Sequence, residues 1–371
     1  MSQAKSQLIV LGTRERGYCM LKSFAAHNFR CFKNVELSDL RLVNLVVGKN
    51  AAGKTALLEA IRLGLAGTPQ VLFQMNQSRG FQSYFPQPLT RELFEAQWNL
   101  YFFNFDSTKP ILTECTDSEG KRATLKVGYD PKKTVTVTQI PAGGGSLAPT
   151  IIPLAFDRND FAGHHSVLHA TVHPQGPLNL EAGPELGTVS EFYSWQINPQ
   201  LTAQWFSQVS VQKREQEVLD AVNQMYGSLI KSLTVLSPSQ FPAIFADIPS
   251  LKERLPLSLV SAGINKFVTV LSAILTRARG VVLIDEIENG FYYETFPHLW
   301  KAVLSFATLC QTQVFVSCHS LECIRAVLPL LKDHESDFML LRAERENGAS
   351  GVTSITGDFF EAALEQNFEV R

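Results

Sequence analysis

The sequence predicts an α/β protein built on a mainly parallel sheet. Three strand-like runs, at residues 43–47, 281–284 and 313–317, are short and rich in apolar residues. Such runs, bounded by turn residues, are typical of strands that are buried on both faces of a sheet. Helical patterns follow the last two runs at residues 296–309 and 321–331, and alternating strands and helices imply parallel pairing.

Residues 48–55 follow the first run and match the phosphate-binding pattern G-x-x-x-x-G-K-[ST]. The helical pattern from Ala56 completes the strand, loop and helix that this motif needs. We expect backbone N–H groups to face one anion, Lys54 to follow the β- and γ-phosphates, and Thr55 to supply a hydroxyl to Mg²⁺. The expected ATP-binding residues of the loop are Gly48, Lys49, Asn50, Ala51, Ala52, Gly53, Lys54 and Thr55.

Two adjacent carboxylates, Asp285 and Glu286, follow the run at residues 281–284. The carboxyl ends of parallel strands share one edge of a sheet, so both side chains are expected beside the phosphate loop. In that position Asp285 holds Mg²⁺, while Glu286 orients and deprotonates the water that attacks the γ-phosphate.

Two further stretches offer polar groups next to helix starts. His319 follows the third run, and its ring is expected to hydrogen-bond the γ-phosphate, although Ser320 also has the character of a simple helix N-cap. Ser261 and Gly263 precede an apolar helix and offer a hydroxyl and N–H groups to a phosphate. As a bare pattern, Ser-x-Gly before a helix is more often only a cap.

The remaining cysteines and histidines predict no metal site. Cys318, His319 and Cys323 match no common zinc spacing, and the scattered cysteines predict no disulfide. Pro174 disfavours a helix in the histidine-rich segment before it, so an exposed loop is expected there. The four histidines of that segment are His164, His165, His169 and His173.

The composition is that of a folded protein, and its net charge does not predict binding to nucleic acid. Of its 371 residues 45% are hydrophobic, which is enough for a sizeable core. The formal net charge of -2 argues against nucleic-acid binding driven mainly by charge. No apolar run approaches the ~18 residues of a membrane span, and the first residues lack the apolar core of a secretion signal. We therefore expect a cytoplasmic protein that does not contact membranes.

The nucleotide-binding core is expected to be discontinuous, formed by residues 21–69 and 255–371. Its first part reads as two antiparallel strands with a turn at Lys33-Asn34. Residues 70–200 are expected to form a β-rich insertion with a loop, and residues 201–254 a helical lobe of one helix or a hairpin. The strands expected in the insertion are 98–105, 111–113, 123–127 and 134–138.

In combination these segments resemble the ABC-type ATPase heads of the SMC/RecF class. The similarity is greatest to compact AAA-like ATPases related to the overcoming-lysogenization-defect (OLD) family, found in bacterial defence and toxin-antitoxin-like modules. It covers residues 21–69 and 215–371, and it implies a P-loop NTPase fold, ATP hydrolysis and Mg²⁺. The matching motifs are Asn28-Phe29-Arg30, residues 43–55, Ser261-Ala262-Gly263, residues 283–290 and residues 318–322.

In that family two heads hold ATP between them, the phosphate loop of one facing the signature turn of the other. The resemblance implies that Arg30 assists the loop in binding ATP and that Lys54, Glu286 and His319 are catalytic, with Glu286 as the base. Ser261 and Gly263 would act on the partner's nucleotide. The family's glutamine loop falls within residues 70–100, where six residues fit equally: Gln70, Gln74, Gln77, Gln82, Gln87 and Gln97.

These observations lead to the expectation of a Mg²⁺-dependent ATPase that works as a homodimer or higher oligomer and gates a separate effector protein, a nuclease or a toxin. The effector is expected on another chain because the sequence has no Asp-x-Asp pair typical of a built-in nuclease. The alternative is a RecF-like clamp that closes on DNA. A GTPase is disfavoured, since Asn265-Lys266 is followed by Phe-Val and not by the x-Asp that reads guanine.

Overall fold

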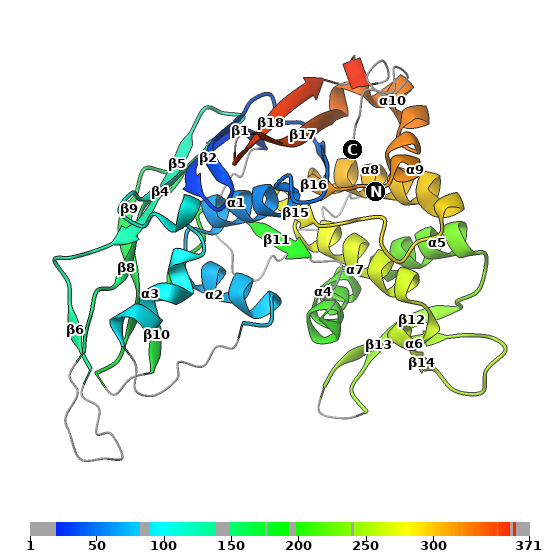
Figure 1. Ribbon diagram of the computed structural model, residues 1–371. Coiled ribbons are helices and arrows are strands. Elements are labelled where there is room, and N and C mark those ends of the chain that lie inside the picture. The colour runs from blue at the N-terminus through cyan, green and yellow to red at the C-terminus, as the bar shows by residue number, and fades with distance from the viewer. Residues whose placement is uncertain are drawn as a thin grey trace, which may run out of the picture.

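The structure, a computed structural model, describes residues 20–81, 90–137, 149–174, 177–192, 198–238, 241–346, 348–356 and 359–360. Two large sheets, one antiparallel and one mainly parallel, enclose one helix, α1 (Lys54–Ala66), and a layer of further helices covers the other side of the parallel sheet (Figure 1). Among these residues no helix is both long and apolar enough to cross a bilayer.

The expected parallel sheet is present and carries the phosphate loop near its centre. Its five neighbouring strands β11, β15, β16, β3 and β17 are parallel, and β18 adds an antiparallel edge by forming a hairpin with β17. In sheet order the strands are β11 (Val189–Phe192), β15 (Val281–Ile284), β16 (Gln313–Ser317), β3 (Val43–Val47), β17 (Phe338–Glu346) and β18 (Ala349–Thr356).

Both faces of this sheet are buried, which explains the runs of apolar residues in its strands. Along β15, Val281 and Leu283 pack on the side of α1, whereas Val282 and Ile284 pack against the outer helices. Alternating residues of one strand therefore enter two different cores, as the period of two in a strand requires.

The second sheet is antiparallel and joins segments that the sequence had assigned to separate parts. The first two strands, β1 (Leu21–Phe29) and β2 (Phe32–Leu37), turn at Arg30-Cys31, so the turn expected at Lys33-Asn34 is wrong. Positive φ angles of 57° at Asn28 and 51° at Arg30 bend the chain there. The remaining strands, next to β1 in sheet order, are β4 (Ile111–Asp117), β5 (Arg122–Tyr129), β8 (Leu154–Asn159), β9 (His165–Val172) and β10 (Leu178–Leu180).

The β-rich stretch after residue 100 is thus not a separate lobe, because β4 pairs directly with β1. The strands expected at 111–113 and 123–127 are confirmed within β4 and β5. The run at 98–105 is wrong as a strand: it contains the end of α3 (Arg91–Asn99) and a 3₁₀ turn, η1 (Phe103–Phe105). Among its described residues, the run at 134–138 contributes β6 (Val135–Thr136), which pairs with β7 (Thr150–Ile151). In the chain, α2 (Pro69–Ser78) lies between α1 and α3.

The outer helices form the layer that presents the predicted signature turn. Of the two predicted alternatives, one helix or a hairpin, the structure has a hairpin of α4 (Pro199–Val211) and α5 (Glu215–Tyr226), and Gly227, with φ of 70°, follows α5. Leu233 continues the apolar spacing of α5, but it lies in a small sheet at the lower right of Figure 1. This sheet consists of β12 (Ser232–Leu236), β13 (Ala243–Asp247) and β14 (Leu255–Pro256).

The last helices follow the order that the sequence predicts, except that one predicted helix is divided into two. The expected helix at 321–331 is two helices, and Pro329 lies in the first turn of the second. The sequence also predicts a short helix at residues 359–364, most of which lies outside the described residues. The elements from residue 257 to 337 are α6 (Leu257–Val260), α7 (Ala262–Thr276), η2 (Tyr293–Thr295), α8 (Phe296–Cys310), α9 (Leu321–Arg325), α10 (Leu328–His334) and η3 (Glu335–Asp337).

Candidate active site

The phosphate loop leads from β3 into α1 and has the conformation of an anion-binding turn. Gly48 and Gly53 have φ of 141° and 111°, and Ala51 has φ of 63°, so the loop curls at three points. The Lys54 ammonium donates to the carbonyl oxygens of Gly48 at 2.7 Å and Lys49 at 3.1 Å. Burial lowers the pKa of Lys54, and the carboxylate of Asp285 is the largest influence opposing that shift. The loop thus holds a partly desolvated cation at its centre.

Gly48 is required here by space as well as by conformation. A Cβ at this position would lie 2.2 Å from the backbone oxygen of Ala343 in β17, far below any real contact. The neighbouring strand thereby fixes the start of the loop.

Asp285 lies at the carboxyl end of β15, beside the start of α1. The Thr55 hydroxyl donates to one oxygen of its carboxylate (Thr55 Oγ1 to Asp285 Oδ2, 2.8 Å), and the Ser317 hydroxyl donates to the other. Burial raises the pKa of Asp285, while these two hydroxyls oppose the shift. Thr55 and Asp285 are 230 residues apart in the chain, yet their side chains meet at one sheet edge, as the strand order predicts.

Glu286 follows Asp285 in a strained turn that several groups stabilise. Its φ is 49°, its backbone N–H donates to Ser317 Oγ at 2.7 Å, and its carboxylate accepts from the Asn289 amide at 2.6 Å. Lys266, on α7, donates from Nζ to the carbonyl oxygens of Glu286 at 2.6 Å and Asn289 at 3.1 Å. Lys266 is buried, and desolvation lowers its pKa to about 8. The backbone that carries Glu286 is therefore held by the helix following the signature turn.

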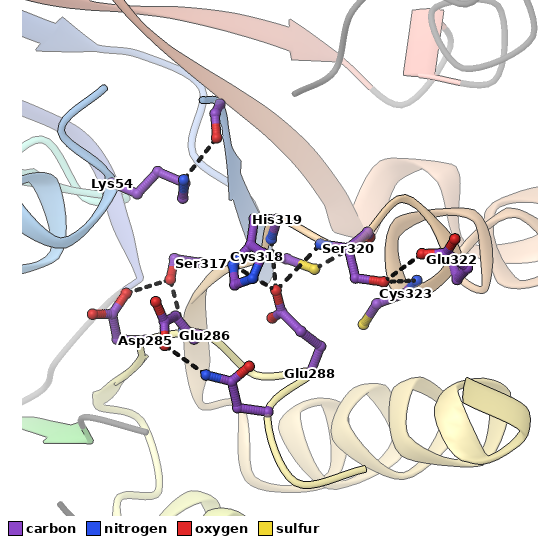
Figure 2. A network of polar contacts seen from close by, with 12 residues as sticks. Lys54, Asp285, Glu286, Glu288, Ser317, Cys318, His319, Ser320, Glu322 and Cys323 are labelled. Atoms are coloured by element: carbon purple, nitrogen blue, oxygen red, sulfur yellow. Dashed lines mark hydrogen bonds and ion pairs between the residues drawn. The ribbon is translucent and has the colours of Figure 1, made fainter. Parts of the chain in front are cut away.

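His319 follows β16 and contacts Glu288, a buried residue of the same turn. The ring nitrogen Nδ1 lies 2.9 Å from Glu288 Oε1, and the backbone N–H of His319 donates to the same oxygen at 2.7 Å (Figure 2). Ser320 caps α9 as expected, its hydroxyl accepting from Cys323 N at 3.2 Å. Sequence reasoning missed Lys266 and Glu288 as parts of this site, although Glu288 lies two positions after Glu286 in the acidic motif.

Ser261 and Gly263 both have local roles at the start of α7. The Ser261 hydroxyl accepts from the backbone N–H of Ile264 at 3.3 Å, as in an N-cap. A Cβ on Gly263 would lie 2.4 Å from the backbone oxygen of Gly290, so this glycine allows α7 to approach the turn after Glu286. Contacts within one chain thus account for the small residues of the signature turn.

Arg30 lies one residue beyond β1 and its guanidinium pairs with the buried carboxylate of Glu59 on α1. Arg79 pairs with the other oxygen of the same carboxylate. The adjacent residues Cys31 and Phe32 would contact a Cβ on Gly53, so the turn touches the phosphate loop. The structure places the Arg30 guanidinium on α1 and not on the loop itself.

The other predicted polar groups lie away from this site or outside the described residues. His165 and His169 belong to β9, so the histidine-rich loop is wrong; His169 is buried and lies 2.9 Å from Glu181. Gln70 donates to backbone oxygens of Leu180 and Glu181, and Gln82 and Gln87 are not among the described residues. Within the part of the chain that the structure describes, no group of three metal-ligating side chains is present and the cysteines are free.

The donor set beside the loop fits magnesium. A carboxylate and a hydroxyl oxygen, from Asp285 and Thr55, lie 2.8 Å apart next to a phosphate-binding loop. Mg²⁺ prefers hard oxygen ligands and is held by one or two carboxylates together with substrate phosphates. These two residues can therefore hold the ion that accompanies a bound triphosphate.

Comparison with known proteins agrees with this geometry. Residues 20–178 match the sequence model described as an AAA ATPase domain. A head domain of Smc from Pyrococcus furiosus, with an extended coiled coil and bound to the C-terminal domain of ScpA, superimposes with a TM-score of 0.51. The comparison covers 93% of this chain and 98% of that structure at 10% identity. The fold is that of a P-loop ATPase head.

Two further matches extend the comparison. A second Smc head, bound to the C-winged helix domain of ScpA, has a TM-score of 0.46 and 12% identity, covering 93% of this chain and 99% of that structure. A Helicobacter pylori (strain ATCC 700392 / 26695) protein named "ATP/GTP phosphatase" is 22% identical over 343 residues, covering 86% of this chain and 90% of its own length. The expected enzyme class, an ATP hydrolase, agrees with the matched domain and with the name of this relative.

Proposed function

We propose that this chain is a Mg²⁺-dependent ATPase whose turnover controls a partner protein. One contact carries the proposal: the hydroxyl of Thr55, at the end of the phosphate loop, donates to the carboxylate of Asp285 at 2.8 Å. These residues belong to distant segments, and their meeting places a nucleotide-binding loop and a pair of carboxylates at one sheet edge. The AAA ATPase match and the relative named for ATP/GTP hydrolysis support the same activity.

Different residues of the site bind the phosphates, hold the metal ion and activate the attacking water. The backbone N–H groups of the loop and the Lys54 ammonium bind the β- and γ-phosphate oxygens, with Lys54 exchanging its carbonyl partners for phosphate. Thr55 and Asp285 hold Mg²⁺, which neutralises and polarises the phosphates when it is bound. The Glu286 carboxylate orients the attacking water and accepts its proton, and His319 hydrogen-bonds the γ-phosphate.

The proposal includes a two-headed arrangement in which Ser261 and Gly263 face the nucleotide of a second copy. The helix N-terminus at α7 offers N–H groups to a phosphate, and Gly263 couples this helix to the turn that carries Glu286. Binding of a second copy and hydrolysis are therefore linked through one rigid element. The Smc head from Pyrococcus furiosus is bound to a ScpA domain, and by analogy of fold we infer a separate effector protein for this chain, as in the OLD-related defence modules it resembles.

The test uses Glu286→Gln, which keeps the size of the side chain but removes the base. With saturating MgATP its mass by light scattering is expected to double from the 41.2 kDa of one chain, because ATP is bound but not cleaved. Lys54→Ala is the matched control and is expected to stay monomeric, since it loses the cation that holds the phosphates. A Glu286→Gln protein that binds MgATP and remains monomeric contradicts the two-headed arrangement, and a wild-type protein without ATP turnover contradicts the ATPase.

A further inference from the structure

A single oxygen of Glu288 accepts two backbone N–H groups from the start of the segment that follows β16 and also lies close to the ring of His319. Glu288 Oε1 accepts from the backbone N–H of His319 at 2.7 Å and from that of Ser320 at 3.2 Å. The same oxygen lies 2.9 Å from His319 Nδ1 (Figure 2). Backbone and ring of His319 are thus fixed by one carboxylate.

The ring contact goes beyond helix capping. A capping carboxylate needs only the backbone N–H groups, and Ser320 already caps α9 through its own hydroxyl. An ionised carboxylate only accepts hydrogen bonds, so a ring nitrogen that pairs with it does so as the protonated nitrogen. In the neutral ring, Nε2 is then the unprotonated nitrogen, on a side chain that is 43% exposed, whereas the Glu288 side chain is only 6% exposed.

The Glu288 carboxylate lies close to a buried cation on α7. Its second oxygen, Oε2, is buried and has no hydrogen-bond partner among the described residues. The buried Lys266 ammonium interacts electrostatically with Glu288 more strongly than with Glu286 or Asp285. Lys266 also holds the backbone of Glu286 and Asn289, so the turn contains one cation placed to balance its acidic side chains.

We propose that Glu288 is a positioning residue for His319. It holds the proton on Nδ1 and orients Nε2 toward the γ-phosphate, and Nε2 donates to that phosphate after taking a proton from solvent, so that the doubly protonated ring lies beside the carboxylate. The inference rests on the proposed ATPase function. The turn of residues 286–290 then has two roles, because it carries the catalytic base, Glu286, and also orients the ring of His319.

The first test reads the proton position directly in the wild-type protein. Selective ¹⁵N labelling of histidine, with the His319 signals assigned by their absence in His319→Ala, is expected to show a protonated Nδ1 at neutral pH. This measurement needs neither turnover nor a Glu288 variant. An Nδ1 without a proton overturns the proposal.

The second test is a double-mutant cycle with ATP turnover as the readout. Glu288→Gln keeps an acceptor oxygen at the same reach but removes the charge. It is expected to lower kcat about tenfold and to leave KM for ATP within about twofold, in the range seen when an outer partner of a functional histidine is replaced. Combined with His319→Ala, the same change is expected to alter kcat by less than about twofold, because its effect passes through the ring.

The outcomes separate this role from a structural one and from failure of the proposed function. An equal loss of kcat in both backgrounds means that Glu288 acts on the fold and not through His319, and an unchanged kcat in the wild-type background overturns the proposal as well. Glu322→Gln is the matched control, since Glu322 contacts the hydroxyl of Ser320 at 2.9 Å at the same helix start, and its kcat is expected to stay within about twofold. Absent turnover in the wild type counts against the ATPase alone, because the ¹⁵N result stands apart from it.

Discussion

Replacing Gly48 by alanine tests how the fold holds the phosphate loop. The new Cβ would lie 2.2 Å from the oxygen and 3.1 Å from the carbon of the Ala343 carbonyl, at a residue whose φ is 141°. Both contacts are to backbone, in a strand paired with β3 from Phe338↔Val43 to Arg342↔Val47, so no side chain can rotate away. β3 and β17 must separate locally, or the loop must change its path.

The magnitude follows from two effects. A non-glycine residue in this region of φ costs about 1–3 kcal/mol, and overpacking against a fixed neighbour costs about 1–3 kcal/mol. Gly48→Ala is therefore expected to lower the free energy of unfolding by about 2–6 kcal/mol, a large part of the ~5–15 kcal/mol typical of a domain. A shifted loop is also expected to weaken ATP binding, because its N–H groups no longer converge on one anion.

Urea unfolding followed by circular dichroism measures the first effect, and ATP titration of the folded variant measures the second. Gly351→Ala is the matched control: a Cβ at Gly351 meets nothing within 4 Å, so its unfolding free energy is expected to change by less than about 1 kcal/mol. Equal unfolding midpoints for the two variants would refute the close approach of β17 to the loop.

Three further variants examine the surroundings of the site. Gly263→Ala places a Cβ 2.4 Å from the Gly290 carbonyl oxygen and is expected to lower the free energy of unfolding by about 1–3 kcal/mol in urea even without ATP; an unchanged value restricts Gly263 to contacts with a second copy. The buried Lys266 has a pKa of about 8, below its ordinary value of 10.5, so the unfolded chain binds more protons between these values and stability rises with pH there. Lys266→Met is expected to lack this rise, on the order of 1–3 kcal/mol between pH 7.5 and 10, and identical pH profiles of unfolding for both proteins contradict the burial of the ammonium. Glu59→Gln removes the charge shared by Arg30 and Arg79 and is expected to lower the melting temperature through a loss of about 1–3 kcal/mol, whereas an unchanged melting temperature argues against this buried pairing.

The core of the site could be predicted because its signals are local or follow from parallel strand order. Residues 48–55 form one continuous motif, and Asp285 follows an apolar strand, so a single rule about strand ends brings Thr55 and Asp285 together. Lys266 and Glu288 carry no such signal. Each is a buried charge whose partners lie on another element, and only the packing of α7 against the turn at 286–290 reveals them.

The fold predictions failed where one pattern fits two structures. Phe94 and Trp98 pack edge to face four residues apart on α3, yet the aromatic residues from Trp98 onward also have strand character. Leu229 and Leu233 continue the helical spacing of α5, but Gly227, with φ of 70°, follows the end of the helix and β12 begins at Ser232. The joining of β4 to β1 is a long-range pairing, which no local pattern in either strand specifies.

The most direct measurement of the central claim is steady-state MgATP hydrolysis by the wild type and by Asp285→Asn. We expect Mg²⁺-dependent turnover that falls by at least about 100-fold in the variant, because the buried carboxylate beside Thr55 loses the charge that holds the ion. Asp39→Asn, which changes a carboxylate with an exposed side chain paired to Lys22, is the control and is expected to turn over like the wild type. Turnover by Asp285→Asn at the wild-type rate would contradict a single site formed by the phosphate loop and the end of β15.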